Sequence, residues 1–180
     1  MVRSDARENR EKILAAARDL FLESGEAPST NQVAQRAGVG AGTLYRHFPT
    51  REALVLAVYQ DEVDRIIADV PEILAREAPL EALRLWTLEL VAGMRRKHGL
   101  GDALGASAHQ SIAEQTYGPV IAAIDTMLDA GKADGTIRAD AEAGDYLQFT
   151  GALWRAAPGP EDRAPRMLAL LLDALRADPA

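Results

Sequence analysis

Apolar residues recur at spacings of three and four along almost the whole chain, and this period constrains the fold more than any other feature. In the first segment, for example, the apolar positions include Ile13, Leu14, Ala17 and Phe21. This spacing places apolar side chains on one face of an α-helix, whereas alternating β-branched residues, which would indicate strands, are nearly absent. We therefore predict an all-α protein.

Glycine, proline and capping residues divide this pattern into about nine helices. The predicted ranges are 5–24, 29–38, 41–48, 50–70, 79–97, 101–107, 110–134, 142–156 and 161–177. Ser29 and Gln32 have the spacing of a capping box, with Thr30 as the alternative cap, and Gly38 is expected to end that helix. Pro71 is expected to stop the fourth helix, because proline lacks the amide hydrogen that a helix interior needs.

The composition excludes several kinds of site. The 180 residues include no cysteine, which rules out disulfides, thiolate nucleophiles and cysteine-ligated zinc and fits a reducing compartment. The beginning of the sequence, MVRSDARENREK, is charged where a signal peptide would need an apolar run. The longest run without Asp, Glu, Lys or Arg, residues 103–113, is too short to span a membrane. We expect a cytoplasmic protein that does not contact a membrane.

Charge is distributed unevenly along the chain. The formal net charge of −7 by itself argues against nucleic-acid binding. Residues 1–51, however, carry eight bases and six acids, whereas residues 52–180 carry twelve bases and 21 acids. This asymmetry is typical of a chain in which one part meets a polyanion and the other does not.

The segment TNQVAQRAGVGAGTLYRHFPTREAL, residues 30–54, has the spacing of a helix-turn-helix. Ala34 is small enough for two helices to approach closely, Gly38 permits a left-handed turn, and Leu44 supplies apolar packing. Within it, AGVGAGTLYRHFPTREAL resembles the signature of the TetR family of transcriptional regulators. The resemblance covers residues 10–58 well, and elsewhere it is limited to the number and length of the helices.

The resemblance implies two domains and a function. Residues 1–50 correspond to a helix-turn-helix DNA-binding domain, with the motif at about 29–48, and residues 51–180 to a larger helical domain that binds an effector and dimerises. The family leads us to expect a ligand-responsive repressor that binds a near-palindromic, double-stranded DNA operator as a homodimer. The sequence does not identify the small-molecule effector.

In such a domain the third helix enters the major groove, and its small first residues let the backbone approach the DNA. The resemblance makes Tyr45 and His47 phosphate contacts and Thr43 a phosphate or base contact; the alternative for Tyr45 and His47 is surface packing. A serine often stands in the family where this chain has Gly40, so a hydroxyl is missing there. The full predicted set of DNA-binding residues is Thr30, Gly40, Ala41, Gly42, Thr43, Tyr45, Arg46, His47 and Arg51.

Basic residues flank this segment on both sides. Arg51 lies in the first turn of a helix, where the macrodipole disfavours a cation. Either a DNA phosphate or a pair with Glu52 or another nearby acid is therefore expected to favour it. Arg3, Arg7 and Arg10 form either a basic arm that reaches the DNA or a solvated, frayed terminus.

The C-terminal helices carry apolar residues on nearly every turn, and most of these are expected to be core. A ligand pocket is predicted from Trp86, Met94, His98, His109, Gln110, Tyr117 and Met127, with a structural role as the alternative for the histidines. The last two helices have more apolar surface than one intramolecular face needs, which predicts a dimer interface; the alternative is a buried helix in a monomer. The predicted interface residues are Leu147, Gly151, Trp154, Leu168, Leu171, Leu172 and Leu175.

Catalytic motifs are missing from the sequence. There is no zinc-protease, phosphate-loop or nucleophile-elbow motif, and none of the three histidines has metal-ligand spacing to another. We therefore expect no enzyme, no metal and no cofactor. The alternatives are a helical ligand-binding or interaction module, or a small all-α enzyme, without DNA activity, and both would leave residues 40–51 without a role.

Overall fold

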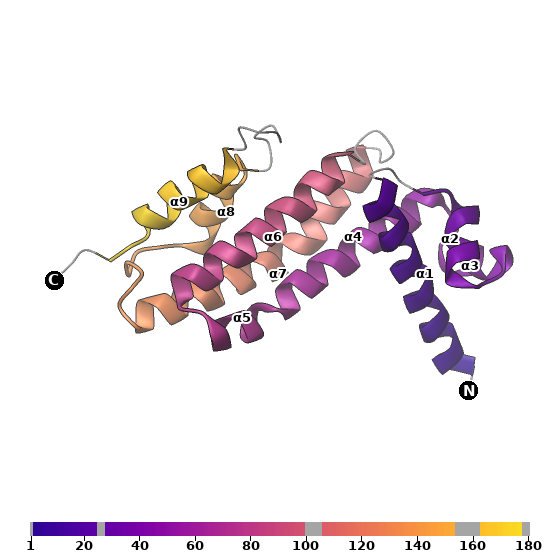
Figure 1. Ribbon diagram of the computed structural model, residues 1–180, viewed down its shortest axis with the longest axis horizontal. Helices are drawn as coiled ribbons and strands as arrows, with labels where there is room; N and C mark the ends of the chain where they lie inside the picture. The colour runs from indigo at the N-terminus through magenta and orange to yellow at the C-terminus, as the bar shows by residue number, and fades with distance from the viewer. Residues whose placement is uncertain (1, 25–27, 100–105, 154–162, 178–180) are drawn as a thin grey trace. The chain divides into compact units, whose positions relative to one another are not determined.

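The computed structural model describes residues 2–24, 28–99, 106–153 and 163–177, with side chains except at 2–4, 24, 96–99 and 106–113 (Figure 1). These residues form helices joined by turns, with one isolated antiparallel bridge between Ile137 and Arg176, so the predicted all-α fold is confirmed. The helices are α1 (Val2–Ser24), α2 (Thr30–Ala37), α3 (Ala41–His47), α4 (Arg51–Ala68), α5 (Val70–Arg76), α6 (Pro79–Gly99), α7 (Ala106–Ala133), α8 (Ala143–Thr150) and α9 (Ala164–Ala174).

Contacts divide the chain into two compact units. The N-terminal unit comprises Met1–Glu62 and Arg96–Ala113, and the C-terminal unit comprises Val63–Arg95 and Glu114–Ala180. The functional boundary expected after residue 50 stays a prediction.

The core of the N-terminal unit is shared by α1, α2, α3 and the start of α4. Its buried residues are Ile13, Leu14, Ala16, Ala17, Val33, Ala34, Leu44, Phe48, Leu54 and Ala57. Two ion pairs link the helices around this core. Arg36 of α2 binds both carboxylate oxygens of Glu23 on α1 at 2.9 Å, and Arg18 of α1 binds Asp61 of α4 at 2.7 Å. The helices that carry the helix-turn-helix are therefore held by apolar burial and by charge.

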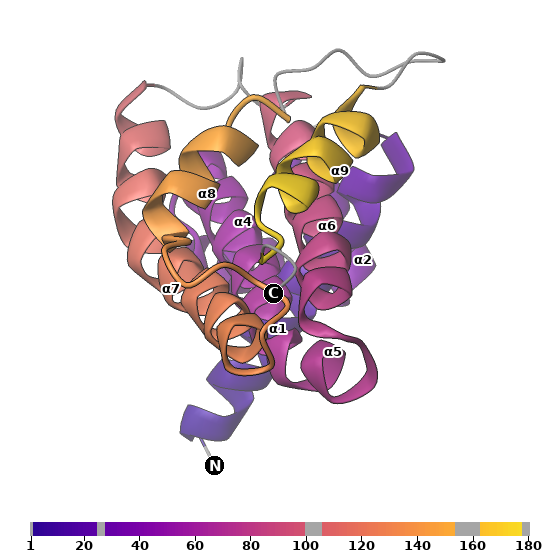
Figure 2. The same ribbon diagram turned by 90° about the vertical axis from the view of Figure 1, so that its left-hand side faces the viewer.

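The C-terminal unit is built on α6 and α7, with α8 and α9 on one side of that pair (Figure 1, Figure 2). Its buried side chains include Leu83, Trp86, Leu90, Ile124, Met127, Leu128, Tyr146 and Leu168. Two polar pairs lie in this core, where a buried hydrogen-bonding group needs a partner. The indole N–H of Trp86 donates to the carbonyl of Ile66 at 2.8 Å, and the hydroxyls of Thr87 and Tyr146 lie 2.6 Å apart. Burial raises the pKa of the Tyr146 hydroxyl.

The turn after α7 depends on a close approach at Gly131. The carbonyl of Gly131 accepts hydrogen bonds from the amides of Thr136 and Ile137, both at 2.9 Å. A Cβ at Gly131 would lie 2.4 Å from Cδ1 of the buried Ile137. Ile137 in turn forms the bridge to Arg176, which fixes the backbone just beyond α9.

Proline explains one difference from the predicted helices. The fourth helix was expected to run to residue 70 and stop at Pro71, but α4 ends at Ala68 and Pro71 lies in the first turn of α5. Proline is tolerated there because the first amides of a helix have no intrahelical acceptor. Pro71 therefore begins a helix that the sequence analysis missed.

Other boundaries also differ from the prediction. Of the helix predicted at 101–107, residues 101–105 lie outside the described part and 106–107 belong to α7, which continues through Pro119. Helix α8 ends at residue 150, earlier than expected, and α9 covers only Ala164–Ala174. Within the described ranges, no helix combines the length and apolar character that a membrane crossing requires.

Candidate DNA-binding interface

The start of α2 is fixed by the predicted capping box. The Ser29 hydroxyl accepts a hydrogen bond from the Gln32 amide at 3.3 Å, and the Gln32 side-chain oxygen accepts one from the Ser29 amide at 3.0 Å. These two bonds satisfy amides that a helix start leaves without partners. Ser29 is thus the cap, and Thr30, the alternative, is the first helical residue.

The turn between α2 and α3 is built on Gly38. Its φ of 67° and ψ of 28° place it in the left-handed region, which glycine adopts without steric cost. The amides of Gly38 and Val39 donate to the carbonyls of Gln35 and Ala34 at 3.2 and 3.0 Å. These bonds close the end of α2 and set the direction in which the chain enters α3.

Helix α3 has one buried and one exposed face. Leu44 and Phe48, the C-terminal cap of α3, are buried in the core of the N-terminal unit. Gly40 caps the start of α3 without a side-chain hydrogen bond. The predicted DNA contacts lie on the rest of its surface. Gly40, Ala41, Gly42, Tyr45 and Arg46 are exposed, and Thr43 and His47 are half-buried.

Two of the predicted contact residues meet across the motif. The hydroxyls of Thr30, at the start of α2, and Tyr45, on α3, lie 3.1 Å apart, within hydrogen-bond distance. Tyr45 as a whole residue is nevertheless 48% exposed. Its hydroxyl is therefore held in place while its ring stays accessible.

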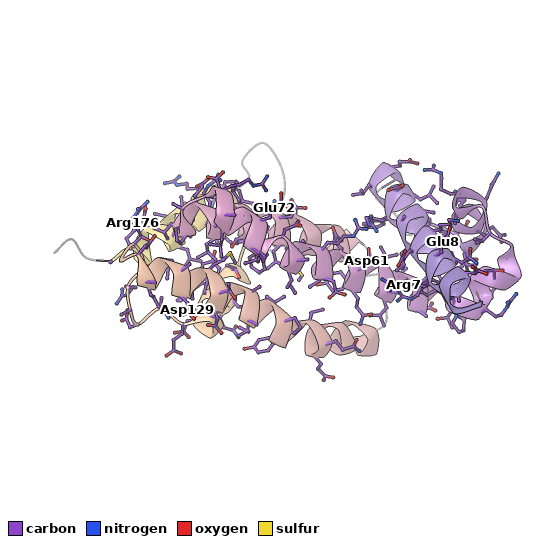
Figure 3. The ribbon with its side chains drawn as sticks, turned by 90° about the horizontal axis from the view of Figure 1, so that it is seen from below. Arg7, Glu8, Asp61, Glu72, Asp129 and Arg176 are labelled. Carbon is purple, nitrogen blue, oxygen red and sulfur yellow. The ribbon has the colours of Figure 1, made fainter. Side chains whose placement is uncertain are left out.

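The first residues of the chain are helical, so the frayed terminus is wrong, whereas a contact of these residues with DNA stays a prediction. Arg7 and Arg10 lie on α1, and the Arg3 side chain lies outside the described part. Arg7 pairs with Glu11 at 2.9 Å, one turn along α1 (Figure 3). The guanidinium of Arg10 lies 5.6 Å from the centre of the Phe48 ring, a cation–π distance. Arg10 is thereby placed beside the end of α3.

Ion pairs neutralise much of the positive charge of this unit. The bases paired with acids are Arg7, Lys12, Arg18 and Arg36. Arg46 makes no ion pair within the part that the structure describes, and it lies on the exposed face of α3. With Arg10 and Arg51 it forms a group of exposed cations on and around α3, which we call the α3 cations.

Arg51 begins α4 close to Glu52. The pKa of Glu52 is lowered chiefly by its own backbone amide, then by a hydrogen bond with Thr50, and least by the charge of Arg51. The helix start is also capped by the Thr50 hydroxyl, which accepts a hydrogen bond from the Ala53 amide at 3.1 Å. The choice between a DNA phosphate and a nearby acid as the partner of Arg51 stays a prediction.

Comparison with known proteins agrees with this geometry. Residues 13–58 match the model of bacterial regulatory proteins of the tetR family, and residues 78–177 match the C-terminal domain of SbtR-like transcriptional regulators. The chain belongs to the TetR family.

Solved structures of TetR-family proteins extend the similarity over nearly the whole of this chain. A TetR transcriptional regulator from Streptomyces coelicolor is 39% identical with a TM-score of 0.77, and the match covers 94% of this chain and 99% of that one. A TetR regulatory protein from Mycobacterium vanbaalenii is 32% identical with a TM-score of 0.71, over 98% and 100% of the two chains.

Curated relatives match over a shorter region. An HTH-type transcriptional regulator of Staphylococcus aureus is 43% identical over 76 residues, and the match covers 41% of this chain and 39% of the relative.

The residues predicted for the effector pocket differ in burial, and the pocket itself stays a prediction. Trp86 and Met127 are buried in the core, Met94 is half-buried and Tyr117 is exposed. The side chains of His98, His109 and Gln110 lie outside the described part. One cavity within the described residues lies between α6 and α9, and none of the predicted pocket residues lines it.

The residues predicted for the dimer interface also differ in burial, and the interface stays a prediction. Gly151, Leu168 and Leu172 are buried within this single chain, because they contribute to its own core. Leu147, Leu171 and Leu175 are half-buried, and Trp154 lies outside the described residues. The large apolar side chains that α8 and α9 expose are Phe149 (66%) and Leu170 (64%). Helical spacing alone could not separate the core face of these helices from the outward one.

A matched pair of glycine substitutions tests the turn. A Cβ would meet open space at both Gly38 and Gly42, so the two positions differ in backbone conformation alone. Gly38→Ala should lower the free energy of unfolding by about 1–2 kcal/mol, the cost of a left-handed L-residue. Gly42→Ala, within α3, should be neutral or stabilising by up to about 1 kcal/mol. Urea unfolding followed by circular dichroism measures both, and equal effects would contradict the role given to Gly38.

Proposed function

We propose that this TetR-family chain is a transcriptional repressor that binds a near-palindromic operator as a homodimer and responds to a small-molecule effector. The observation that carries the proposal is the arrangement of α3. Leu44 and Phe48 anchor it in the core, while Tyr45, Arg46 and the small residues before them are exposed. A short helix held in this way can enter the major groove of DNA.

The proposed contacts divide into positioning and reading groups. Tyr45, with its hydroxyl near Thr30, and the α3 cations are suited to phosphates, because such contacts need a fixed donor or a positive charge. Gly40, Ala41, Gly42 and Thr43 let the α3 backbone approach the base edges closely. His47, half-buried beside the Phe48 ring, completes the set at the end of the helix.

A dimer presents two copies of α3 to the DNA. Helix-turn-helix dimers place their two recognition helices about 34–36 Å apart, or a multiple of this, to meet successive major grooves. We assign the dimer surface to the outward faces of α8 and α9, where Phe149 and Leu170 are exposed. An effector that binds in the C-terminal domain and changes this separation would release the operator.

The remaining parts of the proposal follow from the regulator role. Such a protein works on chromosomal DNA, which places it in the cytoplasm, and the proposal gives it no catalytic step. A gel shift with the DNA upstream of its own gene tests the function. A sequence-specific complex that weakens with salt is expected, and binding to this DNA no tighter than to an unrelated duplex would argue against the proposal.

Replacing the α3 cations should change the salt dependence of DNA binding. Each phosphate contact contributes about 0.9 to the slope of log K against log salt, so losing one contact per subunit should reduce the slope for a dimer by about 2. Arg46→Gln and Arg51→Gln are the test variants. Arg138→Gln, which removes an exposed cation of the C-terminal unit, is the control. Fluorescence anisotropy over a salt series measures the slopes, and unchanged slopes for both test variants would exclude these phosphate contacts.

A double-mutant cycle tests the pairing of Thr30 with Tyr45. Thr30→Val and Tyr45→Phe should each weaken operator binding about tenfold, because each leaves the other hydroxyl without its partner. If Thr30 acts by holding Tyr45, Thr30→Val should have little further effect in the Tyr45→Phe background. Fully additive effects in the same anisotropy assay would show that the two hydroxyls act independently.

Charged substitutions at the exposed apolar residues of α8 and α9 test the proposed dimer surface. Phe149→Asp and Leu170→Asp should each shift the protein from dimer toward monomer, because a buried, unpaired carboxylate is costly. Leu22→Asp is the matched control, since Leu22 is 58% exposed on α1 and belongs to the N-terminal unit. Sedimentation velocity measures the populations. Dimers that survive both substitutions, or equal loss with Leu22→Asp, would place the interface elsewhere.

A further inference from the structure

The C-terminal unit contains a cavity of about 350 Å³ between α6 and α9. Its volume lies in the range of roughly 300–1,000 Å³ that small-molecule sites occupy. It is separate from the residues predicted for the effector pocket, none of which lines it.

One wall of the cavity is a stripe along α9 and the residues after it. Ala169, Leu172, Asp173 and Arg176 line the cavity and follow one another at the spacing of a single helix face. The end of this wall is anchored, because the Arg138 amide donates to the Leu175 carbonyl at 2.9 Å. Leu170, the exposed residue assigned to the dimer surface, is not in this wall.

The opposite wall comes from the start of α6 and carries a closed ion pair. Leu80, Glu81 and Arg84 line the cavity on this side. Arg84 donates through Nε and Nη2 to both carboxylate oxygens of Glu81, at 2.7 and 2.6 Å. This two-point pair satisfies the Glu81 carboxylate, so neither of its oxygens needs a ligand.

The ion pair on the α9 side is open. Arg176 binds Asp173 through Nε and Oδ1 alone, at 3.2 Å, which leaves the two Nη groups of Arg176 and Oδ2 of Asp173 without another described partner. Figure 3 shows Arg176 at the end of the C-terminal helix. The cavity therefore offers adjacent hydrogen-bond donors and an acceptor beside the apolar side chains of Leu80 and Leu172.

We propose that this cavity binds a small zwitterion, namely an α-amino acid with an apolar side chain. Its carboxylate would accept hydrogen bonds from the Nη groups of Arg176, and its ammonium would donate to Oδ2 of Asp173. Its apolar side chain would contact Leu80, Ala169 and Leu172. The lining holds two acidic side chains, Glu81 and Asp173, and two basic ones, Arg84 and Arg176. A zwitterion can place each of its charges beside the opposite charge. A net anion is repelled by the two carboxylates, and a net cation by the two guanidinium groups.

Three ligands of similar apolar bulk separate the contributions of the two charges. L-leucine has both groups, isocaproate lacks the ammonium, and isoamylamine lacks the carboxylate. Isothermal titration of the full chain, without DNA, should give binding of L-leucine about tenfold tighter than that of either analogue, since each lost charged hydrogen bond weakens binding by about this factor. Isocaproate or isoamylamine binding as tightly as L-leucine, or no binding of L-leucine, would overturn the proposal.

Substitutions on α9 test the location. Arg176→Gln and Asp173→Asn should each weaken L-leucine binding about tenfold, again the effect of one charged hydrogen bond. Arg166→Gln is the matched control, because Arg166 is an exposed cation on the same helix that does not line the cavity. Circular dichroism checks that the variants are folded. Unchanged binding in both test variants, or equal loss with Arg166→Gln, would overturn the assignment without bearing on DNA binding.

Discussion

The arrangement of the N-terminal unit depends on the burial of α3 through Leu44 and Phe48. A helix of seven residues is too short to be stable on its own, so its position is set by the core into which these two side chains fit. The capping box at Ser29 and the left-handed turn at Gly38 bring the chain to that core at the required angle. What α3 exposes, including Tyr45, is therefore a consequence of what it buries.

Local signals in the sequence predicted this motif well. A capping serine, a glycine in the left-handed region and a buried leucine act over a few residues, and each was found where the sequence placed it. Signals that depend on tertiary contacts were harder to interpret. In the sequence, Pro71 is compatible both with the end of one helix and with the first turn of the next. The structure places it in the first turn of α5.

The burial of residues on α8 and α9 shows the same limit. Leu168 and Leu172 have the spacing of an interface stripe, but they are buried within the chain, and the exposed positions are Phe149 and Leu170. Period alone cannot distinguish one apolar face of a helix from another. The sequence also could not predict a ligand site at Asp173 and Arg176. Their single hydrogen bond and the opposite side of the cavity, which α6 supplies, are tertiary features.

The net charge of −7 is compatible with a DNA-binding role because of where the charges lie. Ion pairs neutralise Arg7, Lys12, Arg18 and Arg36 of the N-terminal unit, so the proposed DNA binding relies on the α3 cations and on the hydroxyls of Thr30 and Tyr45. The most direct measurement is selection of DNA sites by the full chain from a random duplex library. The account predicts a near-palindromic sequence whose half-sites lie about 10–10.5 base pairs apart, or a multiple of that. Failure to enrich any sequence, or enrichment of a lone half-site, would contradict it.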